Sequence, residues 1–157
     1  MTDVVNFFAY GEFVNEDYFK EKGLEYISKS SVTLSAWQLV FNKIPIDNGG
    51  QEKLGLSNIE PTNDSSGMMH GELYAMDEKF VSKLDEIFGH PDEYHRKVLR
   101  FNRHDFTLIN GLTYIAKPDK IKTGLKPDKA TLKIFKKAKK LFPMLYFSRL
   151  MNTPTCD

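Results

Sequence analysis

Two segments about seventy residues apart constrain the fold of this chain more than any other feature. The first, FFAYGEFVN at Phe7–Asn15, is an aromatic run that meets a Tyr-Gly pair. This pattern is typical of a short buried strand that ends in a turn before a helix. The second, LDEIFGHPDEYHR at Leu84–Arg96, predicts a helix that ends at a glycine, then a loop and a strand that starts with Tyr-x-Arg. The chain therefore mixes strands and helices.

The rest of the chain supports an α+β fold, with a closed or strongly curved sheet flanked by helices. Strand composition predicts strands at Val4–Tyr10, Val32–Phe41, Met68–Met76, Tyr94–Asn102 and Phe106–Ala116, the last two as a hairpin. An irregular loop with one short strand near Leu54–Leu56 is expected over Ile44–Asn58, and a turn-rich segment over Glu60–Gly67. Capping residues predict helices from Asn15 to Gly23, from Asp77 to Phe88, from Asp128 to Leu141, and a shorter piece after Pro143.

Composition predicts a single globular domain over residues 1–157, with C-terminal helices at about 128–151 as part of it. The chain has 157 residues, of which 41% are hydrophobic and 27% charged. A net charge of +1 favours neither nucleic acid nor an anionic membrane, so a nucleic-acid partner is not expected. We expect no signal peptide, no membrane span and no disulfide from the lone Cys156, which together predict a cytoplasmic protein.

The two opening segments resemble the γ-glutamylcyclotransferase-like (AIG2-like) family. That family carries a pattern close to [YF]-F-A-Y-G-S-N near its N-terminus and L-D-x-x-E-G followed by Tyr-x-Arg. The order of the intervening elements is also similar, so the resemblance covers roughly residues 4–150. It implies a small mixed β-barrel with a polar cavity at the Tyr10-Gly11 turn. In active members this cavity binds a γ-glutamyl compound and expels its amine as 5-oxoproline forms.

The resemblance implies a substrate-binding set of Phe7, Phe8, Ala9, Tyr10, Gly11, Glu12 and Tyr94. The chemistry it implies needs few protein groups, because the substrate's own α-amine attacks its γ-carbonyl. One carboxylate can accept the ammonium proton and later return it to the leaving amine. Backbone N–H groups at the turn can stabilise the developing oxyanion. No cofactor is implied.

Phe88 stands where the family places its catalytic glutamate. Apolar residues recur along the predicted helix with helical spacing, which places Phe88 on its interior face: Phe80, Val81, Leu84, Ile87 and Phe88. A phenylalanine has no proton to transfer, and a general acid/base contributes typically ~10²–10⁴ in rate. The activity of the family is therefore expected to be lost or altered here.

Two other carboxylates could take over this role. Glu12 replaces the small serine of the family's Tyr-Gly-Ser pattern at the mouth of the expected cavity. It is either a relocated base or a solvent-exposed turn residue. Asp85 lies three positions before Phe88 on a nearby helix face, and it is either a second candidate or a capping residue. Glu86 points to the other side of the helix.

Further departures from the family pattern concern the ligand itself. Phe13 stands where an asparagine is expected, and Asn15 is interpreted as a helix cap. Thr131 stands where a tyrosine often begins the C-terminal helix, at a place that can touch substrate. Tyr94 is retained as a pocket residue, and Arg96 is retained as a structural ion-pair partner. These changes put the family's substrate in doubt as well as its rate.

Other functional patterns are weak. The four histidines have no metal-ligand spacing and no cysteine partners, so no metal site is expected. Ten lysines lie in Lys117–Lys140 against two aspartates, which is interpreted as a solvated helix face or as a surface for an anionic partner. The sequence thus predicts a small-molecule pocket for a γ-glutamyl or related acidic or amide ligand. The alternative is a non-catalytic binding or interaction protein on the same scaffold, and the oligomeric state is left open.

Overall fold

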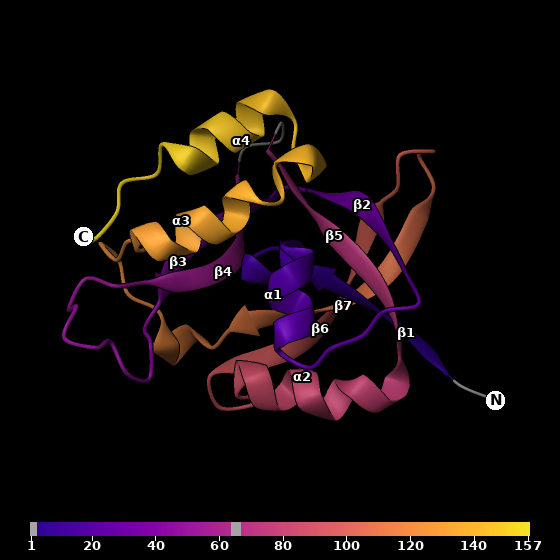
Figure 1. Cartoon of the computed structure of the whole chain (residues 1–157), viewed down its shortest axis with the longest axis horizontal. Helices are drawn as coiled ribbons and strands as arrows, with labels where there is room; N and C mark the ends of the chain where they lie inside the picture. The colour runs from indigo at the N-terminus through magenta and orange to yellow at the C-terminus, as the bar shows by residue number, and fades with distance from the viewer. Residues whose placement is uncertain (1–2, 64–66) are drawn as a thin grey trace.

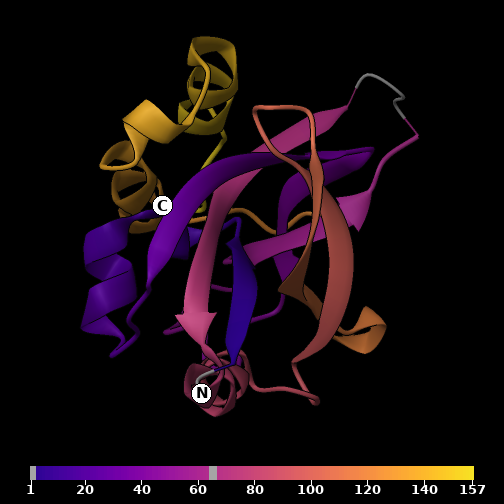
Figure 2. The same ribbon diagram turned by 90° about the vertical axis from the view of Figure 1, so that its right-hand side faces the viewer.

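The computed structural model describes residues 3–63 and 67–157, and a closed β-barrel forms its centre (Figure 2). The barrel has the strand order β1-β5-β2-β6-β7. Its strands are β1 (Val4–Ala9), β2 (Ser28–Ser35), β5 (Met68–Asp77), β6 (Tyr94–Asn102) and β7 (Leu108–Ala116). A parallel pairing of β1 with β7 closes the barrel, and its other strand pairs are antiparallel. The predicted α+β fold with a small mixed barrel is confirmed.

Two strands outside the barrel correct the sequence-based expectations. β3 (Trp37–Lys43) and β4 (Leu56–Pro61) form a separate antiparallel sheet. The single strand predicted at Val32–Phe41 is wrong, because Ala36 has a φ of 64° and turns the chain between β2 and β3. Two further predictions are each partly wrong, because β4 covers the end of one segment and the start of the other. These are the loop predicted over Ile44–Asn58 and the turn-rich segment predicted over Glu60–Gly67. Residues 64–66 of that turn lie outside the described part of the chain.

Side-chain caps at Asn15, Asp77 and Asp128 set the starts of three helical elements, as predicted. Asn15 accepts hydrogen bonds from the backbone at the start of α1 (Glu16–Glu21), and Asp128 does so for α3 (Lys129–Lys136). Asp77 caps a 3-10 turn at Glu78–Phe80, which leads into α2 (Val81–Phe88). α2 ends at Gly89, whose φ of 64° lies in the left-handed region that favours glycine.

The long helix predicted from Asp128 to Leu141 is wrong in its second half. α3 ends at Lys136, a 3-10 turn follows at Lys139–Leu141, and α4 (Met144–Met151) begins after Pro143. Lysines at positions 133, 136, 137 and 140 would be helical neighbours of like charge, which disfavours continuation of the helix. The lysines of α3 are exposed, as expected for a solvated face.

Helices α3 and α4 lie at one end of the barrel, and α2 lies at the opposite end (Figure 1). The main hydrophobic core joins barrel residues to the helices. It holds Phe7, Tyr74 and Tyr114 from the barrel, Leu132 and Phe135 from α3, and Leu150 from α4. Of the helices described here, none combines the length and the apolar character that crossing a membrane requires. Within residues 3–63 and 67–157, no three His, Cys, Asp or Glu side chains are grouped to hold a metal ion.

Candidate functional site

A cavity of about 410 Å³ opens beside the turn that follows β1. The end of β1, the 3-10 turn at Glu12–Val14, the start of β4 and the end of α2 form its walls. All residues of the predicted substrate-binding set line it: Phe7, Phe8, Ala9, Tyr10, Gly11, Glu12 and Tyr94. That they bind a ligand stays a prediction, but the structure brings them around one space of a volume typical for small molecules.

Close packing against β4 fixes the Tyr10-Gly11 turn. The Tyr10 hydroxyl donates a hydrogen bond to the backbone oxygen of Tyr114, at 2.7 Å. A Cβ on Gly11 would lie 2.5 Å from Oγ of Ser57, so any larger residue would displace the serine hydroxyl. Glycine is therefore required here because β4 approaches the turn closely. Backbone conformation does not require it, because the Gly11 φ of −102° lies outside the left-handed region.

The Glu12 carboxyl has an unusual protonation equilibrium for a glutamate. Burial raises its pKa to about 7, and the nearby Asp128 carboxylate adds to this effect. Hydrogen bonds from its own backbone N–H and from the Ser57 hydroxyl act in the opposite direction, as does the positive charge of Lys22. Glu12 is half-buried and lines the cavity, so it is not the solvent-exposed turn residue that was one of its two interpretations.

Ser57 is a central residue that sequence reasoning missed. It is buried, its hydroxyl bonds Glu12, and its backbone oxygen accepts a hydrogen bond of 2.7 Å from the Tyr94 hydroxyl. The lining also includes Leu56, Tyr18 and Lys22, whose Nζ lies 4.9 Å from the centre of the Tyr18 ring. A serine within a predicted loop gives no signal of such a role, because its position depends on the pairing of β4.

Phe88 faces the interior, as the helical spacing predicts. Its ring lies 6.1 Å from that of Phe7, 5.5 Å from that of Phe13, 5.3 Å from that of Tyr94 and 4.4 Å from that of Tyr114, between ring centres. It is half-buried and forms part of the cavity wall. The other apolar residues predicted on the same face of the helix are Phe80, Val81, Leu84 and Ile87. This face is less buried than predicted, because Leu84 alone is fully buried and Ile87 is 36% exposed.

Asp85 does not line the cavity. Its carboxylate accepts a hydrogen bond of 2.6 Å from the Tyr114 hydroxyl and forms an ion pair of 3.2 Å with Nε of Arg96. These contacts support a structural role for Asp85 and Arg96. Glu86 is exposed and points away, as expected.

The other residues that depart from the family pattern have packing or capping contacts. Phe13 is buried and lines the cavity. Asn15 accepts hydrogen bonds from the backbone of Asp17 and Tyr18, and its amide donates to the backbone oxygen of Ile134 at 3.0 Å. Thr131 bonds Asp128 within the first turn of α3 and does not line the cavity.

Comparison with known proteins places this geometry in a family. The family model described as "Gamma-glutamyl cyclotransferase, AIG2-like" matches residues 7–132. Among proteins of curated function, comparison by sequence found no match.

Three solved structures illustrate the shared fold. One is a γ-glutamyl cyclotransferase, with a TM-score of 0.82 and 17% identity, which covers 98% of this chain and 89% of the other. The second is an uncharacterised protein from Homo sapiens, with a TM-score of 0.81, 17% identity and coverages of 97% and 89%. The third is a yeast γ-glutamyl cyclotransferase specific to glutathione, with a TM-score of 0.65, 10% identity and coverages of 94% and 94%.

At these identities the structural likeness shows the fold alone. The family model spans most of the chain, including the turn at Gly11 and the helix that ends at Phe88. The chain belongs to the γ-glutamyl cyclotransferase, AIG2-like family.

Proposed function

We propose that the cavity beside Gly11 binds a γ-glutamyl amine or a related small acid or amide, and that Glu12 is its relocated acid/base. The observation that carries this proposal is a half-buried carboxyl on the cavity wall with a pKa of about 7. A carboxyl of this kind populates its charged and neutral forms almost equally near neutral pH. The balance suits a group that must first accept a proton and then donate it.

The reaction would be an intramolecular acyl transfer. The α-ammonium of the ligand gives a proton to the Glu12 carboxylate, and the free amine then attacks the γ-carbonyl carbon. A carbon–nitrogen bond forms within the ring of 5-oxoproline, and the bond to the departing amine breaks. The protonated Glu12 donates its proton to that amine, and the second proton of the attacking nitrogen passes to the released amine, which departs as an ammonium ion. The ring nitrogen keeps the single hydrogen of the lactam, and the enzyme returns to its starting state. Because the nucleophile belongs to the ligand, orientation in the cavity supplies much of the rate.

The surrounding residues suit a ligand with an α-carboxylate. Lys22 is the cation among the described lining residues, and the ligand's carboxylate would lie near it. Such a pairing would also bring the ligand's amine toward Glu12, because Lys22 lies close enough for its charge to lower the pKa of the Glu12 carboxyl. The apolar wall from Phe88, Phe7 and Phe13 excludes water from the reacting atoms and so strengthens these charge interactions.

A panel of γ-glutamyl amino acids and glutathione tests the proposal through the release of 5-oxoproline. We expect wild-type protein to release it from at least one compound, and Glu12→Gln to reduce release by about 10²-fold or more. Glu86→Gln is the matched control, because it removes an exposed carboxyl on α2 outside the cavity. Its activity should equal that of the wild type.

Two results would contradict this role of Glu12. The first is release that Glu12→Gln leaves unchanged. The second is no release from wild type but measurable release from Phe88→Glu, which restores the family's carboxylate. The second result would indicate a degenerate catalytic site on a scaffold that binds without turnover.

A further inference from the structure

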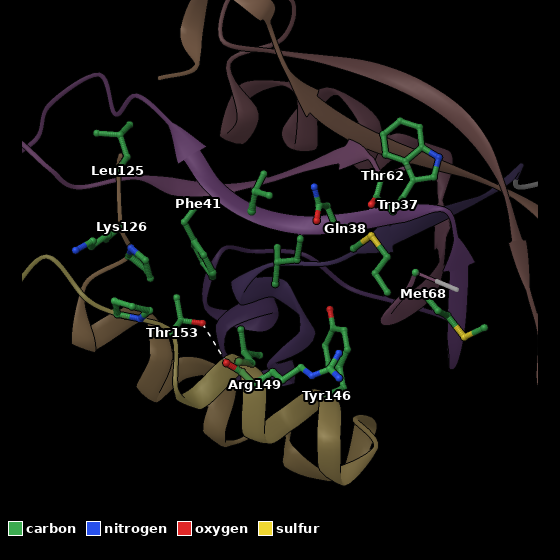
Figure 3. Close-up of a pocket in the computed structure, with 17 residues that line it drawn as sticks. Trp37, Gln38, Phe41, Thr62, Met68, Leu125, Lys126, Tyr146, Arg149 and Thr153 are labelled. Carbon is green, nitrogen blue, oxygen red and sulfur yellow. Dashed lines mark hydrogen bonds between the residues drawn. The ribbon is translucent and has the colours of Figure 1, made fainter. Parts of the chain in front are cut away.

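A second cavity, of about 570 Å³, lies between β3 and α4 (Figure 3). It shares no lining residue with the cavity beside Gly11. β3 forms one wall with Trp37 and Phe41, the start of β5 adds Met68, and α4 forms the opposite wall with Tyr146 and Arg149. Its volume lies within the range of about 300–1,000 Å³ typical of small-molecule sites.

The charged residues that line this second cavity are all positive. Lys126 and Arg149 are cationic, and none of the lining residues that the structure describes is an aspartate or a glutamate. Both side chains are exposed at the edge of the cavity, and the Arg149 side chain runs toward Tyr146 (Figure 3). Guanidinium groups form strong, geometrically specific hydrogen bonds with carboxylates. The lining therefore favours an anionic group on the bound molecule.

The Tyr146 hydroxyl provides a second polar group at this place. It is buried, and its oxygen has no hydrogen-bond partner of good geometry among the residues described. Burial raises the pKa of Tyr146 to about 12, although a hydrogen bond with the backbone of His70 acts in the opposite direction. The hydroxyl thus stays protonated at neutral pH and can donate. Figure 3 shows the Tyr146 ring directed from α4 toward β3, and Tyr146 is one of the residues that line the cavity.

The remaining wall is apolar and adaptable. Phe41 points from β3 toward the helices (Figure 3), and Met68 is a flexible, polarisable side chain that is 49% exposed. Trp37 lies at the edge of this wall, with its ring on the side of β3 away from α4. Burial of an apolar body against such a wall supplies binding free energy, while a few polar groups fix its orientation. The two parts together describe a ligand with an apolar body and one anionic end.

We propose that this cavity is a second binding site, for a small monocarboxylic acid with an apolar body. Its carboxylate accepts hydrogen bonds from the Arg149 guanidinium and the Tyr146 hydroxyl, and its apolar body packs against Leu39, Phe41 and Met68. Lys126 adds positive charge at the other side of the opening. This site goes beyond the cyclotransferase proposal and does not depend on it, because the two cavities have separate linings.

Trp37 makes the test direct, because it is the only tryptophan in the sequence. The probes are 4-phenylbutyrate and its uncharged amide, each titrated into the full chain while the intrinsic fluorescence of Trp37 is recorded. We expect a saturable change with the acid, and an affinity for the amide at least about tenfold weaker, since the charge-assisted bond is lost. Arg149→Gln should weaken binding of the acid by a similar factor and leave binding of the amide unchanged.

Two control variants make the result specific. Arg103→Gln removes an exposed arginine away from the cavity and should bind the acid as the wild type does. Glu12→Gln should also bind normally, which separates this site from the cavity beside Gly11. The proposal is overturned if the acid gives no saturable change, if acid and amide bind equally, or if Arg149→Gln behaves as Arg103→Gln. A response that disappears in Glu12→Gln would overturn it as well.

Discussion

The ring of Phe88 stacks on the ring of Tyr114, with ring centres 4.4 Å apart and planes at 6°. The hydroxyl of the same tyrosine donates to the Asp85 carboxylate of α2. α2 is therefore attached to β7 through one tyrosine that makes both an aromatic and a polar contact. A glutamate at position 88 would lose the aromatic part of this attachment, so Phe88 has a packing role at this place.

The first prediction concerns the stability that this stack provides. Phe88→Ala should lower the free energy of unfolding by about 2–3 kcal/mol, because a half-buried ring with four aromatic neighbours is removed. Ile87→Ala is the matched control, and its cost should stay below about 1 kcal/mol because Ile87 is more exposed. Urea denaturation followed by circular dichroism measures both. Equal losses in the two variants would contradict the account.

The second prediction separates a structural from a catalytic role for Asp85. Asp85→Asn keeps an oxygen that can accept from Tyr114 but loses the charge that faces Arg96. We expect a loss of about 1 kcal/mol in unfolding free energy, because the ion pair is partly exposed. Release of 5-oxoproline should stay within about threefold of wild type. If Asp85 were the acid/base, the release rate would fall by about 10²-fold or more.

The third prediction follows from the raised pKa of Glu12. The folded protein binds this proton more tightly than the unfolded chain, whose glutamate ionises near 4.5. The contribution of Glu12 to stability is therefore fully present below about pH 4.5 and is lost as the pH rises through about 7. The loss amounts to at most about 3 kcal/mol.

Denaturation curves between pH 4 and 8 measure this effect as a difference between wild type and Glu12→Gln. The difference removes the contributions of other groups, such as Glu16, whose pKa is lowered by its hydrogen bonds to Tyr26, Lys20 and Lys29. The stability of the wild type should fall relative to Glu12→Gln across this range. Parallel curves would show that Glu12 ionises as an ordinary glutamate.

The fourth prediction concerns an ion pair beneath the Tyr94 end of β6. Nζ of Lys43 lies 2.9 Å from a Glu93 oxygen, and the lysine side chain is 1% exposed. Lys43→Met should cost about 3 kcal/mol of unfolding free energy, because it leaves Glu93 with only the longer, exposed pair to Lys120. Lys120→Met is the control and should cost less than about 1 kcal/mol. Thermal unfolding distinguishes the two, and a smaller effect from Lys43→Met would contradict the prediction.

Local sequence signals predicted much of the fold. Asn15, Asp77 and Asp128 cap the helices that they were expected to cap, since the groups that they bind lie within three residues. The 3.6-residue period placed Phe88 toward the interior, and the family resemblance placed the Tyr10-Gly11 turn at a cavity. The caps and the helix face depend on residues close together in the sequence. The turn was predicted from the family's sequence pattern.

β4 and Ser57 could not be predicted because they depend on distant contacts. The backbone N–H of Ala116 donates to the Asn58 side chain, and the Tyr94 hydroxyl donates to the Ser57 backbone. Their partners lie 58 and 37 residues away along the chain, and the segment itself has little strand character. The second cavity escaped prediction for the same reason, because β3 and α4 meet only in the folded chain.

The ionisation of Glu12 decides whether this carboxyl can act as the acid/base of the cavity. Its carboxyl carbon can be followed by carbon-13 NMR between pH 4 and 9, assigned by its absence in Glu12→Gln, with and without a γ-glutamyl amino acid. We predict a pKa of about 7 in the free protein, and a change in that pKa when the compound binds. A Glu12 carboxyl that ionises near its ordinary value of 4.5, with no response to the compound, would contradict its role as acid/base of this cavity.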